Sequence, residues 1–129
     1  MQIAEANLLA GWLGILGGIV SGGALGWYFH RDDWMGGYAS FRRRMTRLGH
    51  VSFFGLGFVN LLFVFSLRAA EIPAAQARLA SVCFIVALVA MPACCFLSAW
   101  RKPLRHLFGI PVVSVLTGLV ALLWRLAQR

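Results

Sequence analysis

The hydrophobic positions of this sequence form four long runs, and every charged residue lies in the stretches between or beside them. The runs cover residues 8–29, 48–67, 79–100 and 107–124. About 20 apolar residues suffice for a helix to cross the hydrocarbon core of a bilayer, because each residue adds about 1.5 Å along the axis. The pattern therefore predicts an all-α polytopic membrane protein, in which four transmembrane helices form an antiparallel bundle and residues 1–129 form one membrane domain.

The first run is rich in glycine, and its small residues recur every four positions. They include Gly14, Gly18, Gly22 and Gly26. Side chains four residues apart lie above one another on a helix, and small-residue faces let membrane helices approach closely. We therefore expect these glycines to form the face on which the other helices pack.

Asn60 is a polar residue near the middle of the second run. Amide side chains within membrane helices commonly form hydrogen bonds between helices. We expect Asn60 to hold two helices together, and the alternative is a contact between its amide and a quinone carbonyl.

Composition supports the membrane assignment, since 60% of the residues are hydrophobic and only 12% are charged. Soluble domains are about 25% charged. A net charge of +8 also occurs in nucleic-acid-binding proteins. Here, however, the basic residues flank apolar runs, as they do in membrane proteins. We therefore expect no nucleic-acid partner, and we expect Arg42, Arg43 and Arg44 to lie near anionic lipid headgroups.

The basic residues are unevenly divided between the two predicted sides of the membrane. One side carries eight and the other carries four, namely Arg68, Arg78, Arg125 and Arg129. Loops that are rich in Lys and Arg face the cytoplasm. The sequence thus predicts that both termini lie on the non-cytoplasmic side of a membrane, which we take to be the inner membrane of a bacterium.

The candidate chemistry lies at the predicted cytoplasmic ends of the helices, which carry His30, His50, His106 and two thiols, Cys94 and Cys95. Imidazole and thiolate bind haem iron, copper and zinc. His50 with His106 is the candidate ligand pair for haem b, and His50 with Cys94 is the candidate metal pair. The simpler interpretation is that His50 forms a hydrogen bond to a neighbouring helix and that the thiols pack as small apolar groups.

The four runs contain no charged residue, whereas ion-coupled transporters depend on such residues within their spans. The sequence also lacks a phosphate loop and a nucleophile elbow. We therefore expect a non-enzymatic accessory subunit of a larger inner-membrane complex for respiratory or photosynthetic electron transfer. The first alternative is a haem- or metal-binding redox protein, and the second is a passive channel or lipid-binding protein.

Overall fold

The computed structural model describes residues 3–128, and this part of the chain is helical with no strand. Four helices in it are long and apolar enough to cross a membrane. They are α1 (Ile3–Trp27), α2 (Phe41–Ala69), α3 (Arg78–Trp100) and α4 (Gly109–Ala127). Short 3-10 helices lie in the connections: η1 (Trp34–Gly36), η2 (Ala74–Ala77) and η3 (Lys102–Phe108). Arg129, which we counted in the charge comparison, lies outside the described residues.

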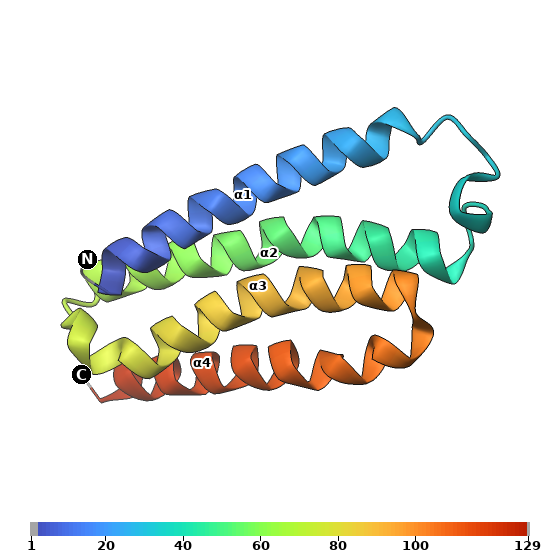
Figure 1. Ribbon diagram of the computed structural model, residues 1–129. Helices are drawn as coiled ribbons and strands as arrows, with labels where there is room; N and C mark the ends of the chain where they lie inside the picture. Colours follow the sequence, from blue (N-terminus) through green and yellow to red (C-terminus); the bar gives the residue numbers. More distant parts are fainter. Residues whose placement is uncertain (1–2, 129) are drawn as a thin grey trace.

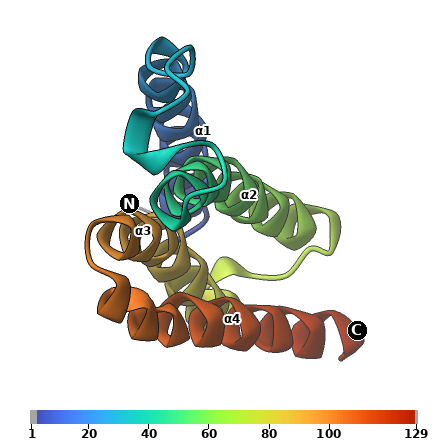
Figure 2. The same cartoon turned by 90° about the vertical axis from the view of Figure 1, so that its right-hand side faces the viewer.

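Consecutive helices reverse direction, so that both ends of the chain lie at the same end of the molecule (Figure 1). We call this the terminal end, and the opposite end, with the α1–α2 and α3–α4 connections, the loop end. The two central helices are α2 and α3, while α1 and α4 flank them. Toward the loop end α1 diverges from α2 (Figure 1), and the view turned by 90° shows α1 and α4 on opposite sides of the central pair (Figure 2).

The helices extend beyond the apolar runs in several places, so the predicted boundaries need correction. The first helix begins at Ile3 rather than at residue 8 and ends at Trp27 rather than at residue 29. The second begins at Phe41 rather than at residue 48, because the Ser40 hydroxyl accepts a hydrogen bond of 3.1 Å from the backbone N–H of Arg43 and thereby caps the helix. Hydropathy detects the apolar length of a helix, whereas hydrogen bonding of the backbone decides where the helix begins.

The other two helices differ less from the prediction. The third, Arg78–Trp100, agrees with the predicted 79–100 to within one residue at its start. The fourth spans Gly109–Ala127 instead of 107–124, and the preceding 3-10 helix η3 forms the connection from α3.

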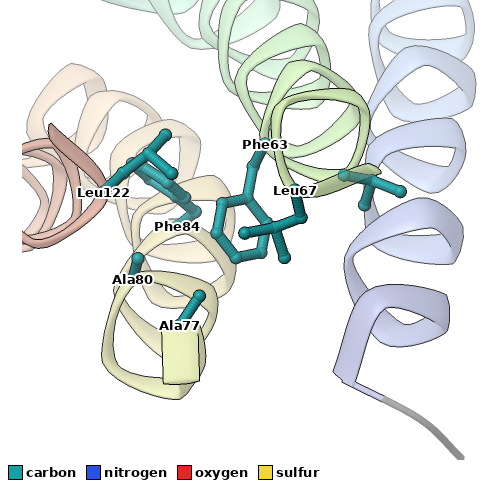
Figure 3. Packing of buried hydrophobic residues seen from close by; sticks show 7 residues of the cluster. Phe63, Leu67, Ala77, Ala80, Phe84 and Leu122 are labelled. Carbon is teal, nitrogen blue, oxygen red and sulfur yellow. The ribbon is translucent and has the colours of Figure 1, made fainter. Parts of the chain in front are cut away.

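The main apolar core lies toward the terminal end, between α2, α3, η2 and α4 (Figure 3). Phe63 and Phe84 meet edge to face with their ring centroids 5.4 Å apart, an arrangement that aromatic rings prefer. The buried members of this cluster are Phe63, Val64, Leu67, Ala77, Ala80, Phe84 and Leu122. A smaller cluster of Leu56, Ala87 and Leu88 continues the contact between α2 and α3.

The backbones of α1 and α2 come close together at glycines on both helices. A Cβ atom built on Gly57 would lie 2.9 Å from the carbonyl oxygen of Gly11, and one built on Gly14 would lie 3.1 Å from the Cα of Gly57. Real Cβ atoms essentially never show contacts shorter than 3.0 Å, and a contact of 3.1 Å is unusually tight. The missing side chains therefore allow the two backbones to approach this closely.

Candidate functional site

A fully buried polar cluster joins α1, α2 and α3. The Asn7 amide Nδ2 donates to Asn60 Oδ1 over 2.7 Å and to the carbonyl oxygen of Ser81 over 3.3 Å. The Ser81 hydroxyl donates to Asn7 Oδ1. Asn60 in turn donates from Nδ2 to the carbonyl oxygens of Leu56, at 2.9 Å, and Phe84, at 3.2 Å.

This cluster leaves Asn60 little capacity for a ligand. An amide nitrogen has two hydrogens, and both hydrogens of Asn60 Nδ2 are donated to the protein. A quinone carbonyl is an acceptor, so it would have to displace one of these bonds. The arrangement is therefore suited to fastening three helices together. Asn7 lies just outside the predicted first helix, and the sequence alone gave no signal that it pairs with Asn60.

His50 lies on α2 and faces α1. Its Nδ1 atom lies 3.2 Å from the Ser21 hydroxyl, and its ring meets Phe54 edge to face with centroids 5.4 Å apart. A Cβ built on Gly22 would lie 2.5 Å from the imidazole Cε1 atom. The absence of a side chain at position 22 thus makes the space that the imidazole occupies.

The Ser21 hydroxyl lies between two groups, 3.1 Å from the carbonyl oxygen of Gly18 and 3.2 Å from His50 Nδ1. When its one hydrogen is donated to Gly18, its oxygen accepts from Nδ1–H of the neutral His50 ring. The Nε2 atom of the neutral ring then carries a lone pair. Such a nitrogen can accept a hydrogen bond or coordinate a metal.

The other candidate ligands of the predicted pairs lie on elements other than α2, and both pairs stay predictions. His106 is exposed on η3, beside Lys102, Pro103 and Arg105, and His30 is exposed after α1. Cys94 and Cys95 are buried on α3, where the Cβ of Cys95 packs against Gly49. Within residues 3–128, no group of three or more His, Cys, Asp or Glu side chains could hold a metal ion.

Side chains of other helices contact the predicted glycine face along only part of its length. Gly14, Gly18 and Gly22 meet Leu88, Phe54 and His50 respectively, while a Cβ built on Gly26 would have no atom within 4 Å. A strict four-residue spacing rotates by about 40° per step on a helix of 3.6 residues per turn. The buried positions instead alternate steps of four and three residues, through Asn7, Gly11, Gly14 and Gly18, which keeps them on one face.

Arg43 differs from its neighbours Arg42 and Arg44, because it is only 2% exposed. Its guanidinium donates to the carbonyl oxygens of Phe29, at 3.2 Å, Arg31, at 3.3 Å, and Asp32, at 3.5 Å. These carbonyls belong to the α1–α2 connection, just after α1 ends at Trp27. The Arg43 guanidinium is thus engaged with the protein's own backbone, while the contact of Arg42, Arg43 and Arg44 with anionic headgroups stays a prediction.

Aromatic rings complete the environment of Arg43. Its Cζ atom lies 4.9 Å from the ring centroid of Phe29, 5.4 Å from that of Tyr38 and 5.6 Å from that of Trp34. Arginine is attracted to aromatic faces at such distances. The signal in the sequence is the set of aromatic residues beside a run of arginines, but nothing in the sequence shows which arginine turns inward.

Comparisons with protein-family models, with curated proteins and with solved structures find no match to this chain.

Proposed function

We propose that this chain is a small, non-catalytic subunit of a larger assembly in a bacterial inner membrane, with a place in respiratory or photosynthetic electron transfer. Its four apolar helices would cross the bilayer as an antiparallel bundle, with the loop end in the cytoplasm and both termini on the other side. The buried polar groups support a structural role, because the Asn7, Asn60 and Ser81 side chains are engaged with one another and with backbone carbonyls.

The observation that carries the proposal is the pair of glycines Gly23 and Gly26 near the loop end of α1, where this helix diverges from α2 (Figure 1). A Cβ built on either residue meets no atom within 4 Å, whereas Gly14, Gly18 and Gly22 each accommodate a side chain of this protein. Glycine within a helix costs about 1 kcal/mol relative to alanine. In membranes, small residues are enriched where helices meet, so a helix of another subunit is the proposed neighbour of this segment.

The flanking position of α1 and α4 agrees with this proposal. Only 17% of the apolar window of α1 and 11% of that of α4 are buried within the chain. Two flanking helices therefore remain available to lipid or to other subunits.

The experiment is affinity purification of the tagged chain from membranes in a mild detergent, followed by native gel electrophoresis and mass spectrometry. We expect the chain to co-purify with other membrane subunits, and we expect Gly23→Leu or Gly26→Leu to release them. Ala24→Leu is the matched control, because Ala24 is also exposed on this helix turn but lies about 100° around the axis from Gly23. Purification of the wild-type chain as a free monomer would refute the proposal.

A redox function is the second candidate, and the geometry of His50 favours it. The bond from Nδ1–H to Ser21 leaves Nε2 as the atom that could bind haem iron or a metal, or accept a hydrogen bond from a quinol. An absorption spectrum of the purified protein tests this function. A Soret band that disappears in His50→Ala would support it, while a protein without colour or metal would exclude haem and metal.

A further inference from the structure

An apolar groove of about 460 Å³ runs between α1 and α3, with Phe53 of α2 between them. Its walls contain small residues on both sides, and its lining is almost entirely hydrocarbon. The lining residues include Ala10, Gly14, Phe53, Leu88, Ala93 and Phe96. Because all four helices are apolar enough for a bilayer, this groove opens toward lipid rather than toward water.

Toward the loop end, the face of α2 that carries Phe53 continues to an exposed arginine. Arg42 lies eleven residues before Phe53, which is about 16 Å along the helix axis and within about 20° of the same direction. Its Nε atom donates to the carbonyl oxygen of Ala99 on α3 over 3.2 Å. The guanidinium is therefore fixed across the α2–α3 contact, one helical turn beyond Phe96.

A second cation lies at the same end of this helix pair. The Nζ atom of Lys102, which follows α3, lies 5.8 Å from the ring centroid of Phe41 at the start of α2. Arg42 and Lys102 are both exposed. The apolar groove thus leads toward two cations at the end of the molecule where membrane proteins place their basic residues.

We propose that this groove and its cationic end form a binding site for one anionic phospholipid. The phosphate lies against the terminal nitrogens of Arg42 and against Lys102, and an acyl chain lies along the groove past Phe96 and Phe53. Arginine suits this role, since its planar guanidinium can donate two parallel hydrogen bonds to a phosphate. The bond to Ala99 uses only Nε, so both terminal nitrogens are available to donate to a phosphate.

The charge at the end of the groove favours a lipid over a transmembrane helix of another subunit. A helix would match the apolar walls, but it gives no reason for two exposed cations at one end. An anionic lipid matches both features, because its phosphate lies at the depth of the basic residues and its acyl chain lies in the hydrocarbon. Arg43 takes no part, because it is buried under the aromatic rings of the α1–α2 connection.

The test is native mass spectrometry of the full-length chain, released from nanodiscs that contain equal amounts of dioleoyl phosphatidylglycerol and dioleoyl phosphatidylcholine. The acyl chains are identical, so a difference in retention reports the headgroup. We expect phosphatidylglycerol to be retained preferentially with a stoichiometry of one. Each cation should contribute about fivefold, which corresponds to the roughly 1 kcal/mol that a basic residue gains near an anionic membrane surface.

Three variants separate the site from general electrostatic attraction. Arg42→Gln should lower the retention of phosphatidylglycerol about fivefold, and Ala93→Phe should lower it by filling the groove. Arg44→Gln is the control, because Arg44 is an exposed arginine in the same part of α2. Unchanged helical circular dichroism shows that each variant is folded. Equal retention of the two lipids, an equal loss in Arg44→Gln and Arg42→Gln, or a second protein chain in place of the lipid would each overturn the proposal.

Discussion

Asn7 Nδ2 donates to Asn60 Oδ1 over 2.7 Å, and this bond joins the first two turns of α1 to the interior of α2. Both side chains are fully buried, so neither can exchange its partner for water. The pair connects two helices that otherwise meet mainly through glycines and a few apolar side chains. We therefore expect the loss of this bond to lower the free energy of unfolding directly.

We expect Asn60→Leu to lower the free energy of unfolding by about 1–3 kcal/mol, because it leaves the Asn7 amide buried without one of its acceptors. Unfolding in mixed micelles of increasing denaturing detergent, followed by circular dichroism, measures this change. Ser52→Ala is the control, since the Ser52 hydroxyl donates only to Gly49 of its own helix, and its effect should stay within about 0.5 kcal/mol. Equal losses in the two variants would show that the interhelical bond is not the cause.

The glycines give a second prediction, in which two identical substitutions have opposite effects. Gly57→Ala would place a methyl group 2.9 Å from the Gly11 carbonyl oxygen, and such overpacking typically costs about 1–3 kcal/mol. Gly23→Ala meets nothing within the chain and should stabilise the monomer by up to about 1 kcal/mol through helix propensity. The same detergent titration measures both. A destabilised Gly23→Ala monomer would contradict the assignment of this position to the outer surface.

Arg43 should be essential to the α1–α2 connection. Arg43→Gln removes the guanidinium from three carbonyl oxygens and three aromatic rings, and hydrogen bonds to a charged group contribute at least about 1.5 kcal/mol. We expect a loss of at least that size, together with faster proteolysis between α1 and α2. Arg43→Lys should recover only part of it, because an ammonium lacks the planar fork of donors. Arg44→Gln, at an exposed position, should change stability by less than about 0.5 kcal/mol.

The positions of the four helices could be predicted from the sequence, because hydrocarbon length and apolar composition decide them locally. Their ends could not, as the start of α2 shows, because Ser40 caps a helix that begins in a polar, arginine-rich stretch. The candidate site was predicted in part. His50 and Asn60 could be identified as polar residues within apolar runs. Their partners Ser21 and Asn7 could not, because these contacts depend on how the helices pack and not on the local sequence. Arg43 illustrates the same limit, since three neighbouring arginines look alike until the fold buries one of them.

The tautomer of His50 provides a prediction that does not depend on any cofactor. We expect the Ser21 hydroxyl to donate to Gly18 and to accept from Nδ1–H, so nuclear magnetic resonance of the ring nitrogens should show a protonated Nδ1 and an unprotonated Nε2 in the neutral state. Ser21→Ala removes that acceptor and should shift the ring toward a mixture of tautomers. A ring protonated on Nε2 in the wild-type protein would show that the Ser21 hydroxyl donates to His50 rather than to Gly18.

Orientation in the membrane is tested by the exposed residues of two connections. The α1–α2 connection contains Asp33 and the α2–α3 connection contains Ala75, and both residues are exposed. A thiol must reach water to react with a membrane-impermeant maleimide, whereas Cys83, Cys94 and Cys95 all lie within the span of α3. Wild-type protein should therefore remain unlabelled in intact spheroplasts and serve as the background. Eight of the twelve Lys and Arg residues lie at the loop end, in the two connections and the start of α2. Because such basic ends face the cytoplasm, Ala75→Cys should be labelled from outside and Asp33→Cys only after permeabilisation. The reverse pattern would place the loop end outside the cell, and the proposed cytoplasmic-leaflet position of Arg42 and Lys102 would then have to be reassigned to the outer leaflet.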